Sequence, residues 1–339
     1  MKLDYLIDKK RLDLFSTYVD FSSFNGKKIL ITGGTGMIGS YLAEAIIRGA
    51  ELQGVSPHKI MITGKSLAPE LNQRFASNKN VDVSIDLLDS SSKDSCYEVV
   101  FHLASPASPK QYQELESLIQ INSKCLVNVI NSCTEKFVFI STGEVYGNKG
   151  GILTEEDHGV FGHESPRDWY PYAKLKGEET SKQLCTEFNS ELNIVRLFHT
   201  FGPGVRKYDG RSFADFLYSA ASGEFPKLYS DGSALRTFLF SADAVLAMLL
   251  IATNGINLRT YNVGSDLPIS IRDFAVKVSE IAGLKGKIEF DSKLAHGLIP
   301  SPNEVLIPDL RRVSELGWSI RTTLDEAIEN TLNFIKSSH

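Results

Sequence analysis

Short apolar segments alternate with amphipathic stretches up to about residue 200. The apolar segments are rich in valine, isoleucine and phenylalanine, and near-continuous runs of this kind predict strands buried on both faces of a parallel sheet. The amphipathic stretches, best seen over 110–133 and 171–188, predict helices between the strands. The expected strands are Lys28–Thr32, Ile60–Ile62, Val81–Val83, Glu98–Phe101, Phe137–Ile140 and Ile194–Leu197. This alternation predicts an α/β fold with a doubly wound parallel sheet of the Rossmann type.

The pattern loosens after about residue 200, where glycine and proline become more frequent. We expect a smaller lobe to begin there, with the chain returning to the sheet near Phe238–Phe240 and Tyr261–Val263. The predicted division is an N-terminal arm (1–25), a sheet domain (26–198, with returns near 237–264) and an interleaved C-terminal lobe (199–236 and 265–339).

Composition and charge exclude several classes of protein. Hydrophobic residues make up 42% and charged residues 23% of the 339 residues, as in folded globular chains. With 36 basic and 41 acidic side chains the net charge is −5, which argues against bulk binding to nucleic acid or to anionic membranes. Residues 1–15 lack the apolar core of a signal peptide, and the run Ala244–Ala252 is far below the ~18 residues of a membrane-spanning helix. We therefore expect a cytoplasmic protein.

The four cysteines, Cys96, Cys125, Cys133 and Cys185, form no C-x-x-C pair. Their spacing argues against a zinc ribbon or a thioredoxin-type site. We expect all four to be buried or neutral thiols, and we expect no metal site.

Three glycines, Gly33, Gly36 and Gly39, follow the first predicted strand and open a helical stretch. In this context Gly33 is expected to let the chain turn tightly, Gly36 to let the backbone approach a pyrophosphate, and Gly39 to let the helix pack against the sheet. The amides at the start of the helix favour an anion. A tight turn without a ligand is the alternative. Residues between and beside the glycines are expected to contact the same dinucleotide: Thr35, Met37 and Ile38.

The end of the second predicted strand bears on the choice between NAD and NADP. An acidic residue there usually binds the adenosine ribose of NAD, but the chain has Gly64 and Lys65 at this point. Lys65 is able to pair with a 2′-phosphate, which slightly favours NADP and leaves NAD open. Further cofactor contacts are expected after the third and fourth strands: Asp86, Leu87, Leu103 and Ala104.

Tyr170 and Lys174 are four residues apart and therefore lie on one face of a predicted helix. An ammonium near a phenol, beside the positive ring of the cofactor, stabilises the phenolate, so Lys174 and the cofactor are expected to lower the pKa of Tyr170 toward that of a general base. Tyr172 and Lys176 have the same spacing, but Pro171 suits the first turn of a helix and favours the first pair. Thr142, at the carboxyl end of a predicted strand, is placed to bind the same substrate hydroxyl as Tyr170.

Taken together, these motifs resemble those of the extended short-chain dehydrogenase/reductases, the nucleotide-sugar epimerase/dehydratase family. The resemblance covers about residues 27–335. Its segments are Thr32–Gly39, His102–Ala104, Asn122, Thr142–Gly147, Tyr170 with Lys174, Phe201–Pro203, Tyr261–Gly264 and Leu316–Trp318. It implies a catalytic Thr142, Tyr170 and Lys174, tightly bound NAD or NADP, a C-terminal lobe that binds a nucleotide diphosphate, and a homodimer formed through the helices at 110–133 and 171–188.

Within this family the chain is most similar to the UDP-glucuronate decarboxylase branch. The similarity lies in His102–Pro109, which includes Ser105 and Pro106, in Thr200–Pro203 and in Asp209–Arg211. It assigns Glu144 to proton transfer after oxidation at C4, and Arg236 to the diphosphate or the reacting sugar. Arg211 and, more weakly, Lys207 are further candidates for anion binding. His199 replaces the asparagine usual in the family and is expected to contact the substrate.

Three functions stay open at this point. A lyase would oxidise the sugar at C4 and then decarboxylate or dehydrate it. Dehydration requires a proton for the departing 6-hydroxyl, and Gly143, which stands where the glucose dehydratases have aspartate, cannot donate one. A C4 epimerase or 4-ketoreductase would use Tyr170 without Glu144, and a dinucleotide sensor would need neither.

Overall fold

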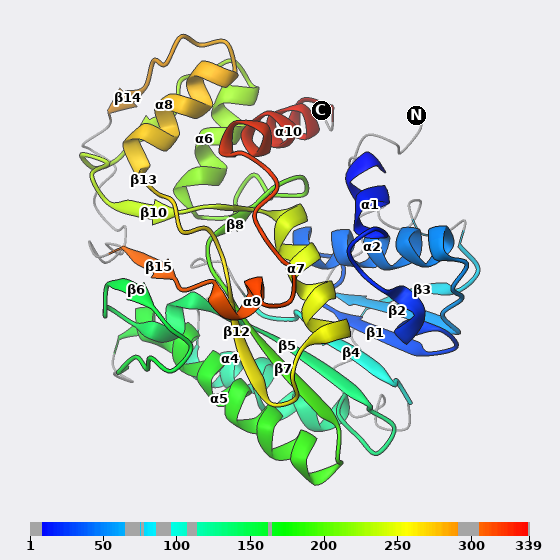
Figure 1. Ribbon diagram of the computed structural model, residues 1–339. Helices are drawn as coiled ribbons and strands as arrows, with labels where there is room; N and C mark the ends of the chain where they lie inside the picture. The colour runs from blue at the N-terminus through cyan, green and yellow to red at the C-terminus, as the bar shows by residue number, and fades with distance from the viewer. Residues whose placement is uncertain are drawn as a thin grey trace.

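The computed structural model describes residues 9–64, 75, 78–85, 96–106, 114–161, 165–290 and 305–337. Its centre is a seven-stranded sheet in the order β12-β7-β5-β4-β1-β2-β3, with every neighbouring pair parallel (Figure 1). The strands are β1 (Lys28–Thr32), β2 (Lys59–Gly64), β3 (Val81–Ile85), β4 (Val99–His102), β5 (Lys136–Thr142), β7 (Glu191–Leu197) and β12 (Arg259–Val263). All six strands expected in the first 200 residues are confirmed, as is the doubly wound α/β fold. The strand order reverses between β1 and β4, the kind of position where open α/β sheets bind ligands.

Helices cover both faces of the sheet because its strands are apolar on both faces. Ile29 and Ile31 of β1 belong to one buried cluster, with α2 (Met37–Gln53) and α7 (Ser241–Asn254). Leu30, between them, points to a second cluster. The elements on that side are α4 (Leu115–Asn122), the 3₁₀ turn η5 (Lys124–Asn128) and α5 (Pro166–Glu187).

The apolar run Ala244–Ala252 lies in α7, where every residue from Ser241 to Ala252 is buried. It is therefore a core helix. In the part of the chain that the structure describes, no helix is both long and apolar enough to span a membrane.

Above the carboxyl edge of the sheet lies a second group of elements (Figure 1). Helices α6 (Ser212–Ala221), α8 (Ile271–Ile281) and α10 (Leu324–Ser337) contact one another there. Three small two-stranded sheets connect them to the rest: β8 (Thr200–Phe201) with β11 (Leu239–Phe240), β10 (Leu235–Thr237) with β13 (Pro268–Ser270), and β9 (Lys227–Leu228) with β14 (Glu289–Phe290). A fourth pairs β6 (Gly151–Leu153) with β15 (Leu306–Pro308).

The remaining short elements pack against these layers. The helix α1 (Lys9–Phe15) and the turn η2 (Phe21–Phe24) contact α2. The turn η6 (Gly143–Tyr146) follows β5, and α9 (Arg311–Ser314) contacts β12.

Several local expectations are corrected. The segment 110–133 is not one helix, because α4 ends at Asn122 and the backbone of Ser123 leaves helical geometry, with its hydroxyl 2.6 Å from that of Thr180. Helix α5 begins at Pro166, so Pro171 lies inside it and not in its first turn. Only Tyr261–Val263 returns to the main sheet, as β12; β11 pairs with β8 instead, where Leu239 is the register partner of Thr200.

The cysteine prediction is wrong for one pair. Cys96 and Cys133 form a disulfide with a Cα–Cα distance of 5.4 Å. They lie in the segments that lead into β4 and β5, and these parallel neighbours begin side by side, so residues 37 positions apart in sequence meet. Cys125 and Cys185 are buried free thiols, as expected.

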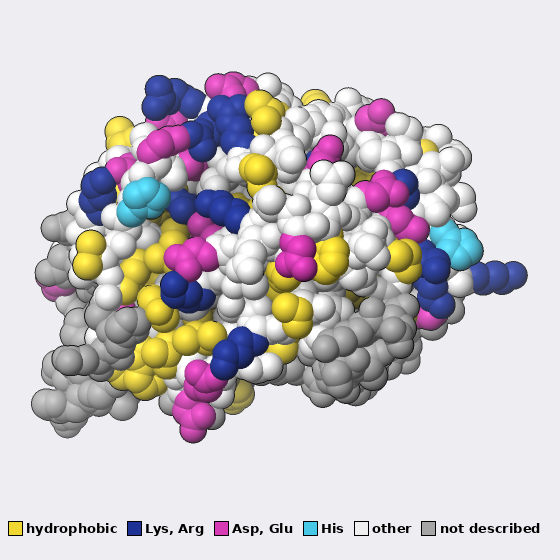
Figure 2. Space-filling model, turned by 90° about the horizontal axis from the view of Figure 1, so that it is seen from below, with side chains coloured by type: hydrophobic (Ala, Val, Ile, Leu, Met, Phe, Trp, Pro, Cys, Tyr) yellow, Lys and Arg dark blue, Asp and Glu magenta, His cyan; other side chains and the backbone are white. Residues whose placement is uncertain are grey.

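The surface has charges of both signs. Figure 2 shows Lys, Arg, Asp and Glu side chains interspersed across the lower face, with hydrophobic side chains gathered toward one side of it. This mixture agrees with the small net charge of −5.

Candidate active site

The glycine turn after β1 is packed too closely for side chains at two of its glycines. Gly33 has φ of 69°, and a Cβ there would come within 2.8 Å of the amide nitrogen of Ala104. A Cβ on Gly39 would lie 2.5 Å from the carbonyl oxygen of Gly33, so this glycine lets α2 pack against the turn, not against the sheet as expected. Gly36 precedes α2 and has no side chain to cap it, which leaves the first helical amides available to an anion. This cradle fits the pyrophosphate of a dinucleotide.

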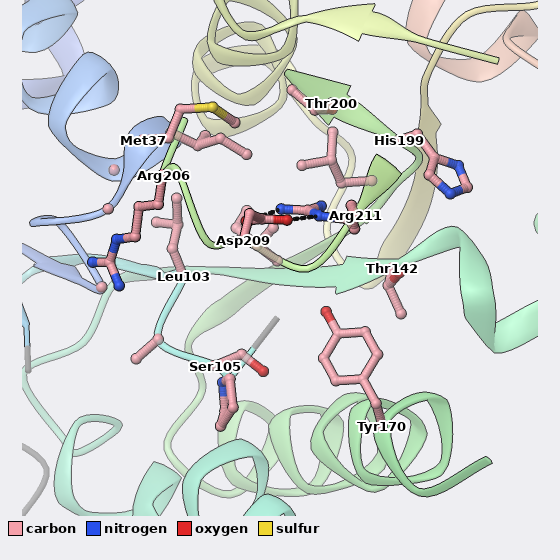
Figure 3. Close-up of a pocket in the computed structure, with 18 of the residues that line it drawn as sticks. Met37, Leu103, Ser105, Thr142, Tyr170, His199, Thr200, Arg206, Asp209 and Arg211 are labelled. Carbon is pink, nitrogen blue, oxygen red and sulfur yellow. Dashed lines mark hydrogen bonds and ion pairs between the residues drawn. The ribbon is translucent and has the colours of Figure 1, made fainter. Parts of the chain in front are cut away.

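A cleft of about 700 Å³ opens at the carboxyl ends of β1, β4 and β5, a volume in the usual range for ligand sites (Figure 3). It collects most of the residues predicted from sequence. These are Gly33, Thr35, Gly36, Met37, Ile38, Gly39, Leu103, Ala104, Ser105, Pro106, Thr142, Glu144, Tyr170, Lys174, His199, Lys207 and Arg211. Arg236 does not line the cleft but is close enough to influence Glu144 and His199. Lys65, Asp86 and Leu87 lie outside the described residues.

Tyr170 extends from α5 into the cleft, with its hydroxyl on the side of Thr142 (Figure 3). The side chain is buried, and burial, together with the negative charge of Glu144, raises the pKa of Tyr170 above its usual value. The nearby hydroxyls of Thr142 and Ser105 act in the opposite direction. In the protein chain alone, burial outweighs the favourable neighbours, and the lowering expected beside the cofactor's positive ring stays a prediction.

Lys174 lies one helical turn beyond Tyr170 and is almost fully buried. Its Nζ donates a hydrogen bond of 2.8 Å to the carbonyl oxygen of Ile140 and lies 5.1 Å from the ring centroid of Phe139. Burial lowers the pKa of Lys174 to about 7, partly offset by the charge of Glu178. The ammonium expected to stabilise the phenolate is thus itself easily deprotonated.

The competing pair, Tyr172 and Lys176, lies outside the cleft. Lys176 forms an exposed ion pair of 2.7 Å with Glu179 and lies 5.6 Å from the ring centroid of Tyr172. Of the two pairs with the same spacing, only Tyr170 and Lys174 line the cleft.

Glu144 lines the cleft, and part of its side chain is exposed there. Loss of water contacts inside the cleft raises the pKa of Glu144, while the positive charges of Arg167, Arg211 and Arg236 lower it. The backbone amide of Glu144 donates a hydrogen bond of 3.3 Å to the hydroxyl of Thr142. The carboxyl group therefore lies within electrostatic range of three arginines and of the Tyr170 phenol.

Gly143 has a steric reason for lacking a side chain. A Cβ at this position would lie 2.8 Å from the ring of Phe198, which is itself buried. An acidic side chain at position 143 would therefore require the core around Phe198 to move.

His199 lines the cleft beside two arginines. Burial and the charges of Arg236 and Arg211 lower the pKa of His199 to about 3, so its ring is neutral near pH 7. Its ring meets that of Phe238 edge-on at 6.1 Å. Arg211 is held by Asp209, which accepts a hydrogen bond of 2.8 Å from its guanidinium.

Two cations near the site were not predicted from sequence, Arg167 and Arg206. Arg167 is three residues before Tyr170, a spacing that places both on one face of α5 and could have signalled it. Arg206 has no such signal, because it reaches the cleft from a loop.

A buried ionic network lies beneath the part of the cleft that Ser141 and Lys174 line, which we call the floor. Arg196 of β7 and Glu178 of α5 are paired at 2.9 Å, and the hydroxyl of Ser141 donates to the same carboxylate at 2.6 Å. Arg196 also donates to the carbonyl of Glu155 at 3.0 Å. Because Glu178 follows Lys174 by one helical turn, this network ties the floor to the sheet.

Comparisons with known proteins agree with this geometry. The pattern of the NAD dependent epimerase/dehydratase family matches residues 29–264. The UDP-N-acetyl-alpha-D-glucosaminuronate decarboxylase of Bacillus cytotoxicus is 30% identical over 310 residues, which cover 86% of this chain and 91% of that protein. UDP-glucuronic acid decarboxylase 1 of Xenopus tropicalis is 26% identical over 326 residues, 91% of this chain and 72% of that protein. In fold, the chain is similar to UDP-glucose 4-epimerase of Thermotoga maritima, with a TM-score of 0.77, 24% identity, and 92% and 99% of the two chains covered.

Proposed function

The chain belongs to the NAD-dependent epimerase/dehydratase family, and on that premise we propose that it decarboxylates a nucleotide-linked uronic acid, as a UDP-glucuronate decarboxylase-like lyase. The observation that carries the proposal is that Glu144 and Tyr170 line one cleft, within electrostatic range of three arginines. The names of the relatives from Bacillus cytotoxicus and Xenopus tropicalis support the same class of substrate.

Tyr170 and Thr142 would act on the sugar 4-hydroxyl. The phenol is the group in the cleft with the reach and chemistry to take its proton, and Thr142 would orient the same hydroxyl. Since burial raises the pKa of Tyr170, proton removal requires added positive charge near the phenol, and Lys174 lies on the same helix face. A bound oxidised nicotinamide would supply that charge and the hydride-transfer chemistry at C4. The glycine turn, Leu103 and Ala104 would hold the cofactor.

Glu144 and the arginines would serve the carboxylate and the carbon next to it. Loss of CO2 from a 4-keto uronic acid starts from the carboxylate anion, and arginine binds and stabilises such a group. Since the environment of Glu144 raises its pKa, the acid is better able to deliver a proton to C5 after CO2 has left. His199, Arg211 and Arg236 would bind the sugar and the diphosphate.

Dehydration is the weaker proposal for this site. It needs a proton donor for the 6-hydroxyl, and the ring of Phe198 occupies the space that a side chain at Gly143 would need. Glu144 would then have to serve both proton transfers.

We further propose NADP as the cofactor slightly ahead of NAD, and a homodimer. The end of β2 supports the first point, since Gly64 is not an acid and lines the cleft. For the dimer, α4 and α5 lie together on one face of the sheet and offer a two-helix surface. The lobe formed by 199–236 and 265–339 would bind the nucleotide diphosphate. Sedimentation velocity on the full chain tests the dimer.

The test of the main proposal is incubation of the enzyme with UDP-glucuronate, with product masses measured. A product lighter by the mass of CO2 supports it, whereas loss of water indicates a dehydratase and an unchanged mass with inverted C4 an epimerase. Glu144→Gln should slow formation of the C5-protonated, decarboxylated product by about 100-fold or more, while substrate binding measured by calorimetry persists. Glu179→Gln, on the exposed side of α5, is the matched control. Undiminished formation of the C5-protonated product by Glu144→Gln would contradict the role of this residue.

A further inference from the structure

The segment 202–211, which we call the strap, lies across the glycine turn. Gly204 has φ of 91°, and a Cβ there would lie 3.3 Å from the Cα of Met37, the first residue of α2. On the other side, the hydroxyl of Tyr218 donates a hydrogen bond of 2.9 Å to the carbonyl of Val205. The amide of Asp209 closes a turn onto the carbonyl of Arg206 at 3.2 Å. The backbone on either side of Arg206 is therefore held in place.

The three cations of the strap differ in what they contact. Arg211 is neutralised by Asp209, and Lys207 Nζ lies 5.9 Å from the ring centroid of Tyr208. Arg206 lines the cleft, yet its guanidinium has no hydrogen bond or ion pair with any residue that the structure describes. It is thus the cation of the strap that is left for a ligand.

Arg206 points to the cofactor end of the cleft. Figure 3 shows its side chain on the side of Met37, directed away from Tyr170 and Thr142. The same end is lined by the glycine turn and by Thr63 and Gly64 at the end of β2. A guanidinium there faces the region where the phosphates of a dinucleotide meet the start of α2.

We propose that Arg206 binds a phosphate group of the dinucleotide. The planar guanidinium fork matches phosphate oxygens in a bidentate arrangement, and the held backbone means that only the side chain is ordered on binding. The phosphate is either in the bridging pyrophosphate or at the 2′-position of the adenosine ribose. The inference rests on the cofactor use in the proposed function and is independent of the sugar chemistry.

The test is calorimetric titration of the full chain, freed of bound nucleotide, with NAD and with NADP. Arg206→Gln should weaken binding by about tenfold, as expected for one charge-assisted contact. Arg206→Lys, which keeps the charge but loses the fork, should fall between this variant and wild type. Lys176→Gln, which removes an exposed charge outside the cleft, should stay within about twofold of wild type. Circular dichroism establishes that each variant is folded.

The pattern across the two nucleotides identifies the phosphate. Equal losses for NAD and NADP support contact with the pyrophosphate, and a loss for NADP alone supports contact with the 2′-phosphate. Unchanged affinity of Arg206→Gln for both nucleotides overturns the inference and leaves the proposed function intact. An equal loss in Lys176→Gln also overturns it, since the effect would then come from the overall charge of the protein. If the wild-type chain binds neither nucleotide, the proposed function fails as well.

Discussion

Replacing Glu178 by glutamine is expected to destabilise the protein far more than its single lost charge suggests. The Glu178 and Arg196 side chains are 4% and 5% exposed. The Glu178 carboxylate accepts hydrogen bonds from Arg196 Nε at 3.1 Å, from Arg196 Nη2 at 2.9 Å and from the Ser141 hydroxyl at 2.6 Å. A glutamine would present an NH2 group to one of these donors and leave the guanidinium without a counter-charge.

The magnitude follows from that uncompensated charge. Breaking a buried ion pair by removing one partner costs about 3–5 kcal/mol, because the remaining ion stays desolvated. The free energy of unfolding of Glu178→Gln should fall by this amount. Lys176→Gln is the matched control on the same helix, since its pair with Glu179 is exposed, and it should cost about 0.5 kcal/mol or less.

Urea denaturation followed by circular dichroism measures both variants. The double variant Glu178→Gln/Arg196→Met should recover part of the loss, because it removes the unpaired cation. The losses of unfolding free energy in the single variants Glu178→Gln and Arg196→Met should add up to about 2 kcal/mol or more above the loss in the double variant. Additive losses, or a loss in Glu178→Gln no larger than in Lys176→Gln, would refute the reasoning.

Three further predictions concern the contact between β2 and the glycine turn, the buried His102 and the disulfide. Gly64→Ala should lower stability by about 1–3 kcal/mol in urea denaturation, since its Cβ would lie 1.9 Å from the Thr35 hydroxyl; an unchanged midpoint argues against this clash. Burial lowers the pKa of His102 to about 3 from 6.5, so the unfolded chain binds more protons and stability should fall as pH drops from 6.5 toward 3. A His102→Asn variant should show a shallower dependence, and an identical slope would count against the reasoning. Thiol titration of the unfolded, unreduced chain should find two free thiols, with Cys96 and Cys133 unreactive until reduced; four would exclude the disulfide.

The strands and the glycine turn were predictable because their signals are local. A strand such as Lys28–Thr32 is apolar on both faces within a few consecutive residues, and the turn needs glycine at positions only three apart. Tyr170 and Lys174 also share one helix, so their common face follows from spacing alone. Where a boundary depended on a single residue, as at Ser123 or Pro166, the local signal was too weak.

The chain alone thus determines the α/β class, the glycine turn and the tyrosine–lysine pair, because each is encoded within one element or turn. Only the tertiary structure decides that Cys96 meets Cys133, that Arg206 lines the cleft with the glycine turn, and that Glu144 lies within electrostatic range of three arginines. It also decides the sign of the pKa shift of Tyr170. Contacts between distant segments and the loss of water around a group arise only when the elements pack, and no window of consecutive residues contains them.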